Sequence, residues 1–138
     1  MAVLRRHITI RLHDTDAAGI LFFGRQFYLA HDSYEEFMAG IGFPLSKVLG
    51  EKHILIPIIH AESDYLRPLR VGDEIEIALT VANIGNTSYI LEYALTDLSG
   101  NLVGKARTVH VILDRQSGQK IPIPEPLRAR LLEFQSAE

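Results

Sequence analysis

The sequence predicts an α+β fold in which a five-stranded antiparallel sheet wraps around one long central helix. An alternating strand pattern comes first in the chain, and a single long helical pattern follows it. Four further strand patterns then succeed one another across turn signals. Because loops alone do not cover a long helix, we expect one face of the sheet to pack against it as a second layer.

The first half of the chain contains the early strand and the helix. Residues 3–12 alternate between apolar and polar side chains in their C-terminal half, which is typical of a strand. Residues 13–24 are rich in Asp, Ala and Gly without a regular period, so they predict a shaped loop. From Arg25 to Ala39 the apolar residues recur at helical spacing, and Gly40 is expected to end the helix. Residues 44–51 predict a short helical segment.

The second half predicts strands separated by turns, and then a short C-terminal helix. Pro57 interrupts the first of these strands and indicates an edge position or a bulge. Three prolines, Pro122, Pro124 and Pro126, predict irregular structure before the final helix. The expected strands cover residues 54–66, 74–81, 89–95 and about 102–113, and the expected helix covers residues 127–134.

Length and composition indicate a single domain, residues 1–138, with one apolar core. The net charge is only −3, without a concentrated basic stripe, so we expect no nucleic-acid partner. The chain has no cysteine, which excludes disulfides, thiolate catalysis and cysteine-ligated zinc. No segment has the pattern of a signal peptide or a membrane span, so we expect a cytoplasmic protein with no membrane contact.

Two acidic residues, Asp14 and Asp16, precede the helix by several residues. A helix start has free backbone N–H groups and the positive end of the helix dipole, which together favour a negatively charged oxygen. A carboxylate held nearby can attack a carbonyl or activate water, while the backbone amides stabilise the oxyanion. These residues suit acyl hydrolysis without Ser, Cys or a metal. The alternative is that both acids are turn formers and helix caps.

The run DTDAAGILFFGRQFYLAHDSYEEF resembles the signature of the 4-hydroxybenzoyl-CoA-type hotdog-fold thioesterases. Asp14, Asp16, Gly19 and Phe23 match that signature, and IPIIHAESDYLRPLRVGDEI resembles the second strand and the turn of the family. The resemblance implies that Asp16 is the nucleophile or general base. It also implies that the backbone N–H of Phe23, supported by the turn at Gly19, polarises the thioester carbonyl.

Within this family, the chain is most similar to the 1,4-dihydroxy-2-naphthoyl-CoA hydrolases of phylloquinone and menaquinone synthesis. They share the His-x-x-Tyr-Glu pattern of residues 31–35 and the PI-x-HAE-x-D-x-LRPL pattern of residues 57–69. The run Ile20–Phe23 departs from them, because they tend to have valines and a Tyr-Phe pair there. The implied reaction is hydrolysis of an aromatic acyl-CoA without cofactor or metal. Three alternatives stay open: a short- or medium-chain fatty acyl-CoA thioesterase, a hotdog dehydratase, and a non-catalytic acyl-CoA-binding module.

Five further residues are candidates for binding the acyl-CoA substrate. The resemblance implies that His31 faces the acyl ring, and the alternative is a helix histidine without a role. Glu35, one turn further on, either orients His31 or is solvated. On a regular strand His60 shares a face with Ile58, and it lines the acyl pocket of a neighbouring subunit or is a buried core histidine. Arg67 and Arg107 are candidates for the CoA phosphates, although either one is also explained as a surface charge.

We expect no metal site and a homo-oligomeric assembly. His7, His53 and His110 are too scattered along the chain for ligand-like spacing. A sheet with a single helix leaves its edges open, and pairing of edge strands in a dimer covers them. The family resemblance adds that the active site lies between two subunits, with a homodimer as the minimal unit and a homotetramer as the expected assembly.

Overall fold

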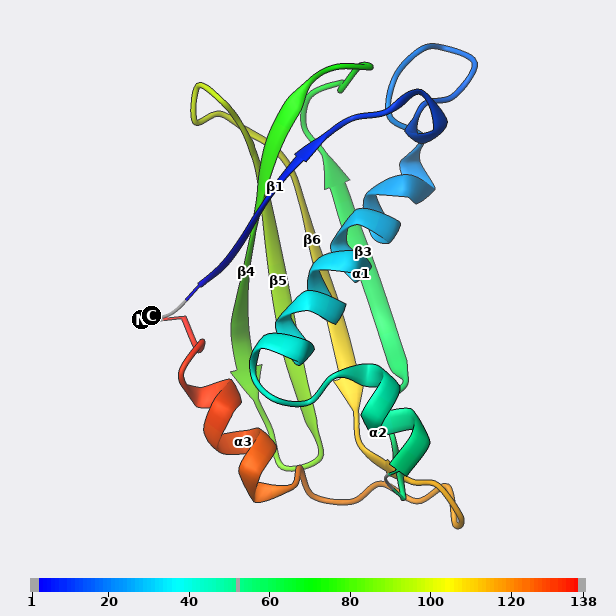
Figure 1. Ribbon diagram of the computed structural model, residues 1–138, viewed down its shortest axis with the longest axis vertical. Coiled ribbons are helices and arrows are strands. Elements are labelled where there is room, and N and C mark those ends of the chain that lie inside the picture. Colours follow the sequence, from blue (N-terminus) through cyan, green and yellow to red (C-terminus); the bar gives the residue numbers. More distant parts are fainter. Residues whose placement is uncertain (1–2, 52, 137–138) are drawn as a thin grey trace.

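The computed structural model describes residues 3–51 and 53–136, and its main element is a five-stranded antiparallel sheet (Figure 1). The strand order is β1–β4–β5–β6–β3. Helix α1 (Phe23–Gly40) lies across one face of this sheet (Figure 1). The predicted α+β arrangement of one sheet and one long helix is therefore confirmed. The strands of the sheet are β1 (Leu4–Thr9), β3 (Ile58–Tyr65), β4 (Glu74–Ile84), β5 (Ser88–Asp97) and β6 (Leu102–Val111).

The smaller elements other than η1 gather at the end of the sheet that contains the β4–β5 turn, whereas η1 lies at the opposite end, beside the start of α1 (Figure 1). Helix α2 follows α1, and a two-stranded sheet pairs β2 with β7. A short 3-10 helix, η1, lies between β1 and α1. Their bounds are η1 (Leu12–Asp14), α2 (Leu45–Glu51), β2 (Ile54–Leu55), β7 (Leu113–Asp114) and α3 (Glu125–Leu132).

Two helix boundaries differ from the predictions. Helix α1 begins at Phe23 rather than Arg25, which places the Phe23 amide in its first turn. Helix α3 begins at Glu125, so the expectation that Pro126 lies before the helix is wrong. Proline is tolerated in the first turn of a helix because the N–H that it lacks has no intrahelical partner there.

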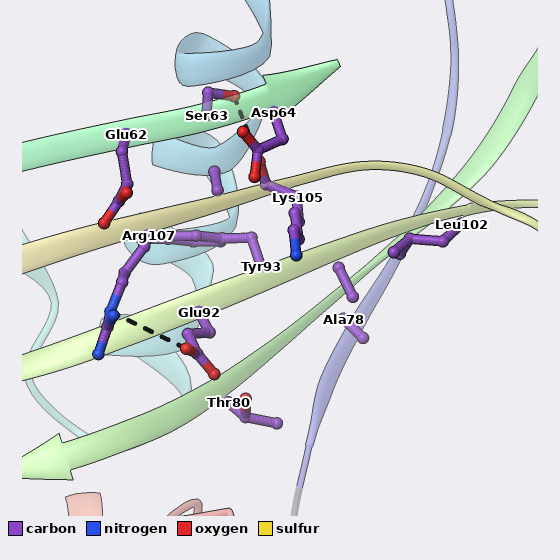
Figure 2. Close-up of a pocket in the computed structure, with 12 residues that line it drawn as sticks. Glu62, Ser63, Asp64, Ala78, Thr80, Glu92, Tyr93, Leu102, Lys105 and Arg107 are labelled. Carbon is purple, nitrogen blue, oxygen red and sulfur yellow. Dashed lines mark hydrogen bonds and ion pairs between the residues drawn. The ribbon is translucent and has the colours of Figure 1, made fainter. Parts of the chain in front are cut away.

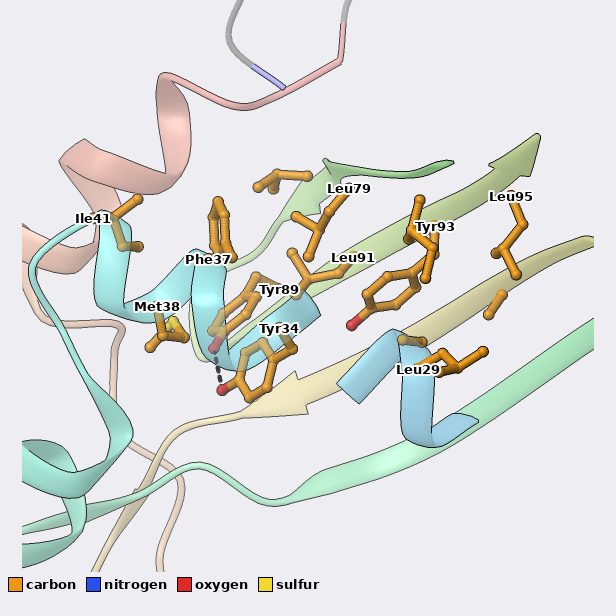
Figure 3. Close-up of a cluster of buried hydrophobic side chains, with 14 of the residues drawn as sticks. Leu29, Tyr34, Phe37, Met38, Ile41, Leu79, Tyr89, Leu91, Tyr93 and Leu95 are labelled. Atoms are coloured by element: carbon orange, nitrogen blue, oxygen red, sulfur yellow. Dashed lines mark hydrogen bonds between the residues drawn. The ribbon is translucent and has the colours of Figure 1, made fainter. Parts of the chain in front are cut away.

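The core lies between α1 and the inward face of the sheet (Figure 3). On β4 and β5 the inward positions alternate with outward ones, as the sequence pattern predicts. Leu79, Leu91 and Leu95 are fully buried there, and each contributes about 1.5–3 kcal/mol relative to an exposed side chain. Phe37 and Met38 bring the apolar side of α1 against the same layer. The burial of one helix stripe and one sheet face thus holds the two layers together.

Strand β3 is an edge strand with a bulge, as Pro57 indicated. The register shifts between Ile58 and His60, so that Ile58 pairs with His110 and His60 pairs with Val109. Because an extra residue reverses the alternation of side chains, Ile58 and His60 lie on opposite faces of the sheet. The expectation that these two residues share a face is therefore wrong.

The outward face of the sheet is polar and slightly hollowed (Figure 2). A depression of about 420 Å³ lies over β3, β4, β5 and β6. Figure 2 shows Glu62, Glu92, Lys105 and Arg107 on this face, with α1 behind the strands. The hollow therefore lies on the side of the sheet opposite α1. It is also opposite the acidic loop, by which we mean residues 15–22 with Asp16.

Candidate active site

The loop between η1 and α1 holds Asp16 at the surface in a defined conformation. Asp16 Oδ1 accepts hydrogen bonds from the backbone N–H groups of Ala18 at 2.9 Å and Ile20 at 3.4 Å. The Gly19 N–H donates to the Asp16 carbonyl at 2.9 Å, and Gly19 has φ +80°, which an L side chain rarely adopts. The second carboxylate oxygen, Oδ2, has no hydrogen-bond donor among the described residues. One oxygen is thus fixed and the other is free to react.

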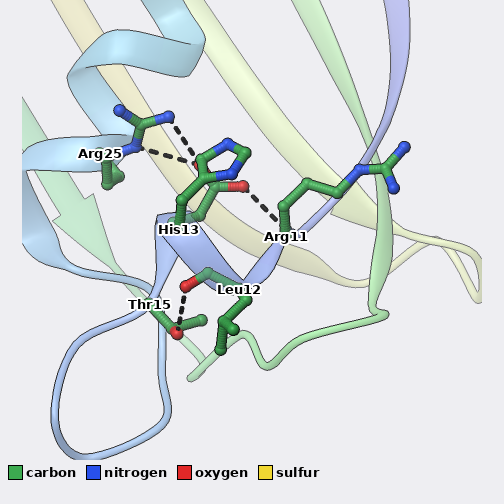
Figure 4. A network of polar contacts seen from close by, with 6 residues as sticks. Arg11, Leu12, His13, Thr15 and Arg25 are labelled. Carbon is green, nitrogen blue, oxygen red and sulfur yellow. Dashed lines mark hydrogen bonds and ion pairs between the residues drawn. The ribbon is translucent and has the colours of Figure 1, made fainter.

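The neighbouring Asp14 has a different environment, because its side chain is buried and both of its carboxylate oxygens accept hydrogen bonds. Figure 4 shows Arg11 and Arg25, which supply the donors. Its Oδ1 accepts hydrogen bonds from Arg25 Nε at 3.0 Å and Nη2 at 2.8 Å. Its Oδ2 accepts one from the Arg11 N–H at 2.8 Å, and its carbonyl accepts one from the Phe22 N–H at 2.9 Å. Asp14 therefore connects the end of β1 to the start of α1 and anchors the loop that contains Asp16.

The start of α1 presents free amides next to this loop. The Phe22 N–H donates to the Asp14 carbonyl, and the Arg25 N–H donates to the Phe22 carbonyl at 2.9 Å. Phe23 and Gly24, the first two helical residues, are among the four whose N–H groups have no intrahelical acceptor. The Tyr65 hydroxyl donates to the Phe23 carbonyl at 2.6 Å and so ties this helix start to the end of β3. The arrangement suits stabilisation of an oxyanion.

A pocket of about 340 Å³ runs beside α1, on the same side of the sheet as the acidic loop. Phe27 lies one turn after the helix start, and His31 lies one turn further, so both are within about 12 Å of Phe23 along the axis. Ile58 and Ala61 of β3 form the opposite wall. The outward depression is larger, but this pocket is the better candidate for the acyl group because it begins at Phe27, one turn after the helix start, and lies on the α1 side of the sheet.

The buried end of the pocket is polar. Tyr93 and Thr108 line it, although their exposed fractions are only 2% and 6%. The Tyr93 and Thr108 hydroxyl oxygens are 3.0 Å apart, and Thr108 Oγ1 is 2.7 Å from His110 Nε2. His110 has no exposed surface, and its Nδ1 has no hydrogen-bond partner among the described residues.

Neutral aromatic rings surround His110. Its ring stacks on Tyr89 with centroids 4.9 Å apart and lies 4.4 Å from the ring of Tyr34. The Tyr34 and Tyr89 hydroxyls are 3.2 Å apart, and this pair is visible in Figure 3. Burial lowers the pKa of His110 to about 3, with a smaller contribution from the charge of His31. Burial also raises the pKa of Tyr34 to about 12 and that of Tyr89 well above its usual range.

The other predicted binding residues are spread over both faces of the sheet. Glu35 is exposed on α1, and no described hydrogen bond joins it to His31. His60 is exposed on the outward face, 3.5 Å from Glu62, so the buried-core alternative for His60 is wrong. Arg107 lies on the same face, 3.9 Å from Glu92. Arg67 is exposed after β3. None of Glu35, His60, Arg67 and Arg107 lines the pocket beside α1.

Sequence reasoning missed Tyr93, Thr108 and His110 as site residues. A signal was present, since Thr108 and His110 are polar residues at alternate positions of a strand whose Ala106 also faces inward. Within the described part of the chain, no three His, Asp or Glu side chains group closely enough to hold a metal ion. None of the described helices is long and apolar enough to cross a membrane.

Comparison with known proteins identifies the class. Residues 10–131 match the profile of the thioesterase-like superfamily, so the chain belongs to that superfamily of thioester hydrolases. The family membership predicted from the Asp-x-Asp motif is therefore confirmed.

Relatives within this superfamily share one enzyme name. A 1,4-dihydroxy-2-naphthoyl-CoA hydrolase of Rippkaea orientalis is 36% identical over 132 residues, which cover 94% of this chain and 96% of that protein. The hydrolase of the same name from Synechococcus elongatus is 36% identical over 120 residues, covering 86% of this chain and 88% of that protein. A solved 1,4-dihydroxy-2-naphthoyl-CoA thioesterase from Synechocystis superposes with a TM-score of 0.90 over 99% of this chain and all of that one, at 23% identity. That likeness supports the hotdog fold.

Proposed function

We propose that the chain hydrolyses an aromatic acyl-CoA, 1,4-dihydroxy-2-naphthoyl-CoA, to the free acid and CoA in phylloquinone or menaquinone synthesis. The observation that carries the proposal is the geometry of Asp16. One carboxylate oxygen is held by the loop amides, the other accepts no hydrogen bond from a described residue, and the loop leads into the start of α1, where the first N–H groups have no intrahelical acceptor. The names of the relatives support the choice of acyl group.

The chemistry follows from this geometry in two steps. Asp16 either attacks the thioester carbonyl carbon, giving a mixed anhydride, or removes a proton from the attacking water. The Phe23 N–H, at the positive end of α1, stabilises the negative charge that forms on the carbonyl oxygen. CoA leaves as a thiolate, which needs no strong general acid. Water then completes hydrolysis of the anhydride if the first route is followed.

The pocket beside α1 suits an aromatic acyl group. Phe27 and Tyr28 supply aromatic surface, and His31 adds a polar edge that can donate or accept a hydrogen bond to a ring hydroxyl. Gly19 supports the loop through its turn. Glu35, His60, Arg67 and Arg107 stay predictions for contacts with the substrate or with CoA bound by a neighbouring copy.

The test measures CoA release with a thiol reagent from a panel of acyl-CoAs. The panel contains 1,4-dihydroxy-2-naphthoyl-CoA, 4-hydroxybenzoyl-CoA, benzoyl-CoA and straight-chain acyl-CoAs. We expect the naphthoyl substrate to have the highest kcat/KM, and Asp16→Asn to lower kcat by about 10²–10⁴-fold. The matched control is Glu125→Gln, which removes the same charge from the exposed first turn of α3 and is expected to retain full activity.

Each result has a distinct meaning. If straight chains are hydrolysed fastest, the acyl group proposed here is wrong while the role of Asp16 stands. If Asp16→Asn turns over like the wild type, the role of Asp16 is wrong. If the wild type hydrolyses nothing but still binds acyl-CoA, the chain is a binding module rather than an enzyme.

We also propose a homodimer that pairs through β3 and assembles further into a homotetramer. Strand β3 forms one edge of the sheet and is exposed at seven of its eight residues, and Ile58 and Ile59 are among the exposed apolar side chains. An open apolar edge of this kind is stabilised by pairing with another strand. Sedimentation velocity measures the mass directly, and a monomer at micromolar concentration would contradict the proposal.

A further inference from the structure

The buried end of the pocket beside α1 holds a pair of hydroxyl groups against otherwise apolar walls. Tyr93 of β5 and Thr108 of β6 both line the pocket and are more than nine-tenths buried. Buried hydroxyls are costly unless each of their hydrogens has an acceptor. Counting the hydrogen-bond donors and acceptors of Tyr93, Thr108 and the neighbouring His110 therefore indicates which kind of ligand the pocket binds.

His110 supplies the first hydrogen bond in this group. Its neutral ring carries a single N–H, and its two nitrogens differ, because Nε2 lies 2.7 Å from Thr108 Oγ1 and Nδ1 has no described partner. An unpaired acceptor is tolerated in a protein interior better than an unpaired N–H. We therefore assign the proton to Nε2, from which it is donated to Thr108 Oγ1.

The two hydroxyls then have one hydrogen more than the protein can accept. Tyr93 and Thr108 each contribute one hydroxyl hydrogen, and their oxygens are 3.0 Å apart, so one hydrogen is used in the bond between them. Neither oxygen has another described partner except His110, which is already the donor. Whichever hydroxyl keeps the second hydrogen lines the pocket, so this donor is directed at the molecule inside it.

We propose that Tyr93 and Thr108 select an acyl group whose aromatic ring carries an oxygen on the side away from the thioester. The inference rests on the proposed function, since it places the thioester carbonyl at the start of α1. From there the ring extends along Phe27 and His31 toward the buried hydroxyls. A ring oxygen accepts the spare hydrogen, whereas a plain ring or an alkyl chain leaves it buried without an acceptor.

Two substrates that differ by one hydroxyl test this selection. 1-Hydroxy-2-naphthoyl-CoA lacks only the 4-hydroxyl of 1,4-dihydroxy-2-naphthoyl-CoA. We expect the wild type to favour the dihydroxy substrate by about 3- to 10-fold in kcat/KM, the usual effect of one neutral hydrogen bond. Removing one hydroxyl leaves the other with a hydrogen that has no protein acceptor, so the test removes both. Tyr93→Phe/Thr108→Val keeps nearly the shape of both side chains without their hydroxyls, and we expect it to bring the ratio close to one. Either single substitution is expected to keep a preference for the dihydroxy substrate.

Because both substrates are measured on the same variant, a general loss of folded protein leaves the ratio unchanged. Thr80→Val makes the same substitution on the outward face of β4 and is expected to keep the wild-type ratio. A Tyr93→Phe/Thr108→Val enzyme with the wild-type preference would overturn the inference, and so would a wild type without any preference.

A binding measurement separates this inference from the proposed function. Calorimetry with non-hydrolysable thioether analogues of the two acyl-CoAs needs no turnover. If the wild type hydrolyses neither substrate but binds the dihydroxy analogue more tightly, and Tyr93→Phe/Thr108→Val removes that difference, the proposed enzyme activity fails and the selection stands. If hydrolysis depends on Asp16 but neither assay distinguishes the analogues, the selection fails and the activity stands.

Discussion

Acidification from pH 6.5 to pH 4.5 is expected to weaken the folded state through one buried side chain, His110. In an unfolded chain a histidine has a pKa of about 6.5. In the folded protein, burial lowers the pKa of His110 to about 3. The rings of Tyr34 and Tyr89 that face it stay neutral in this range, because burial raises their pKa values. No described acidic group contacts the ring to compensate a positive charge.

The direction and the size of this change in the free energy of unfolding follow from proton linkage. Between pH 3 and pH 6.5 the unfolded chain binds a proton at residue 110 and the folded protein does not, so the free energy of unfolding rises with pH. A depressed histidine pKa thus gives stability that is complete above pH 6.5 and is lost as the pH falls toward 3. Integrated from pH 6.5 to pH 4.5, the loss is about 2 kcal/mol.

Urea unfolding at pH 6.5, 5.5 and 4.5 measures this loss, with His110→Gln as the matched variant. Glutamine keeps a donor near Thr108 but does not titrate, while Asp97 and Asp114 titrate equally in both proteins. We expect the wild type to lose about 2 kcal/mol more than the variant over this range. Parallel losses in the two proteins would refute the reasoning, because His110 would then be protonated as easily in the folded state as in the unfolded one.

Two further substitutions test the local geometry. Asp14→Asn removes the charge that holds Arg25 and is expected to lower the free energy of unfolding in urea by about 3 kcal/mol. It is also expected to lower kcat, because the loop loses its anchor. An unchanged unfolding midpoint would contradict this. Gly104→Ala places a methyl group 2.8 Å from Oε1 of the buried Gln26 and is expected to cost about 1–3 kcal/mol by thermal unfolding. Gly50→Ala, in helix α2 with nothing within 4 Å of the added carbon, is the control and should not destabilise.

The fold could largely be predicted from the sequence, because strand alternation and helical spacing are patterns of residues close together in the chain. Alternation over residues 89–95 predicted a strand with one buried face, and all four odd-numbered positions there are buried. The helical spacing after Arg25 predicted α1 in the same way. Local patterns failed where one residue changed the geometry, as at the bulge that separates the faces of Ile58 and His60. Pro126 was misplaced because proline is unfavourable inside a helix but not in its first turn.

The sequence by itself determined the class of fold, the acidic motif and its position before the helix, since these depend on neighbours along the chain. The residue pattern alone left Asp14 and Asp16 equivalent, and only the family resemblance assigned the catalytic role to Asp16. The tertiary structure supplied a physical difference, by burying Asp14 against Arg25 and leaving Asp16 exposed in the loop before α1. It also brought Tyr93 and Thr108 together with His31, although these residues are far apart in sequence. Contacts between residues so distant in sequence depend on strand register and on packing of the helix against the sheet, and no local sequence pattern predicts them.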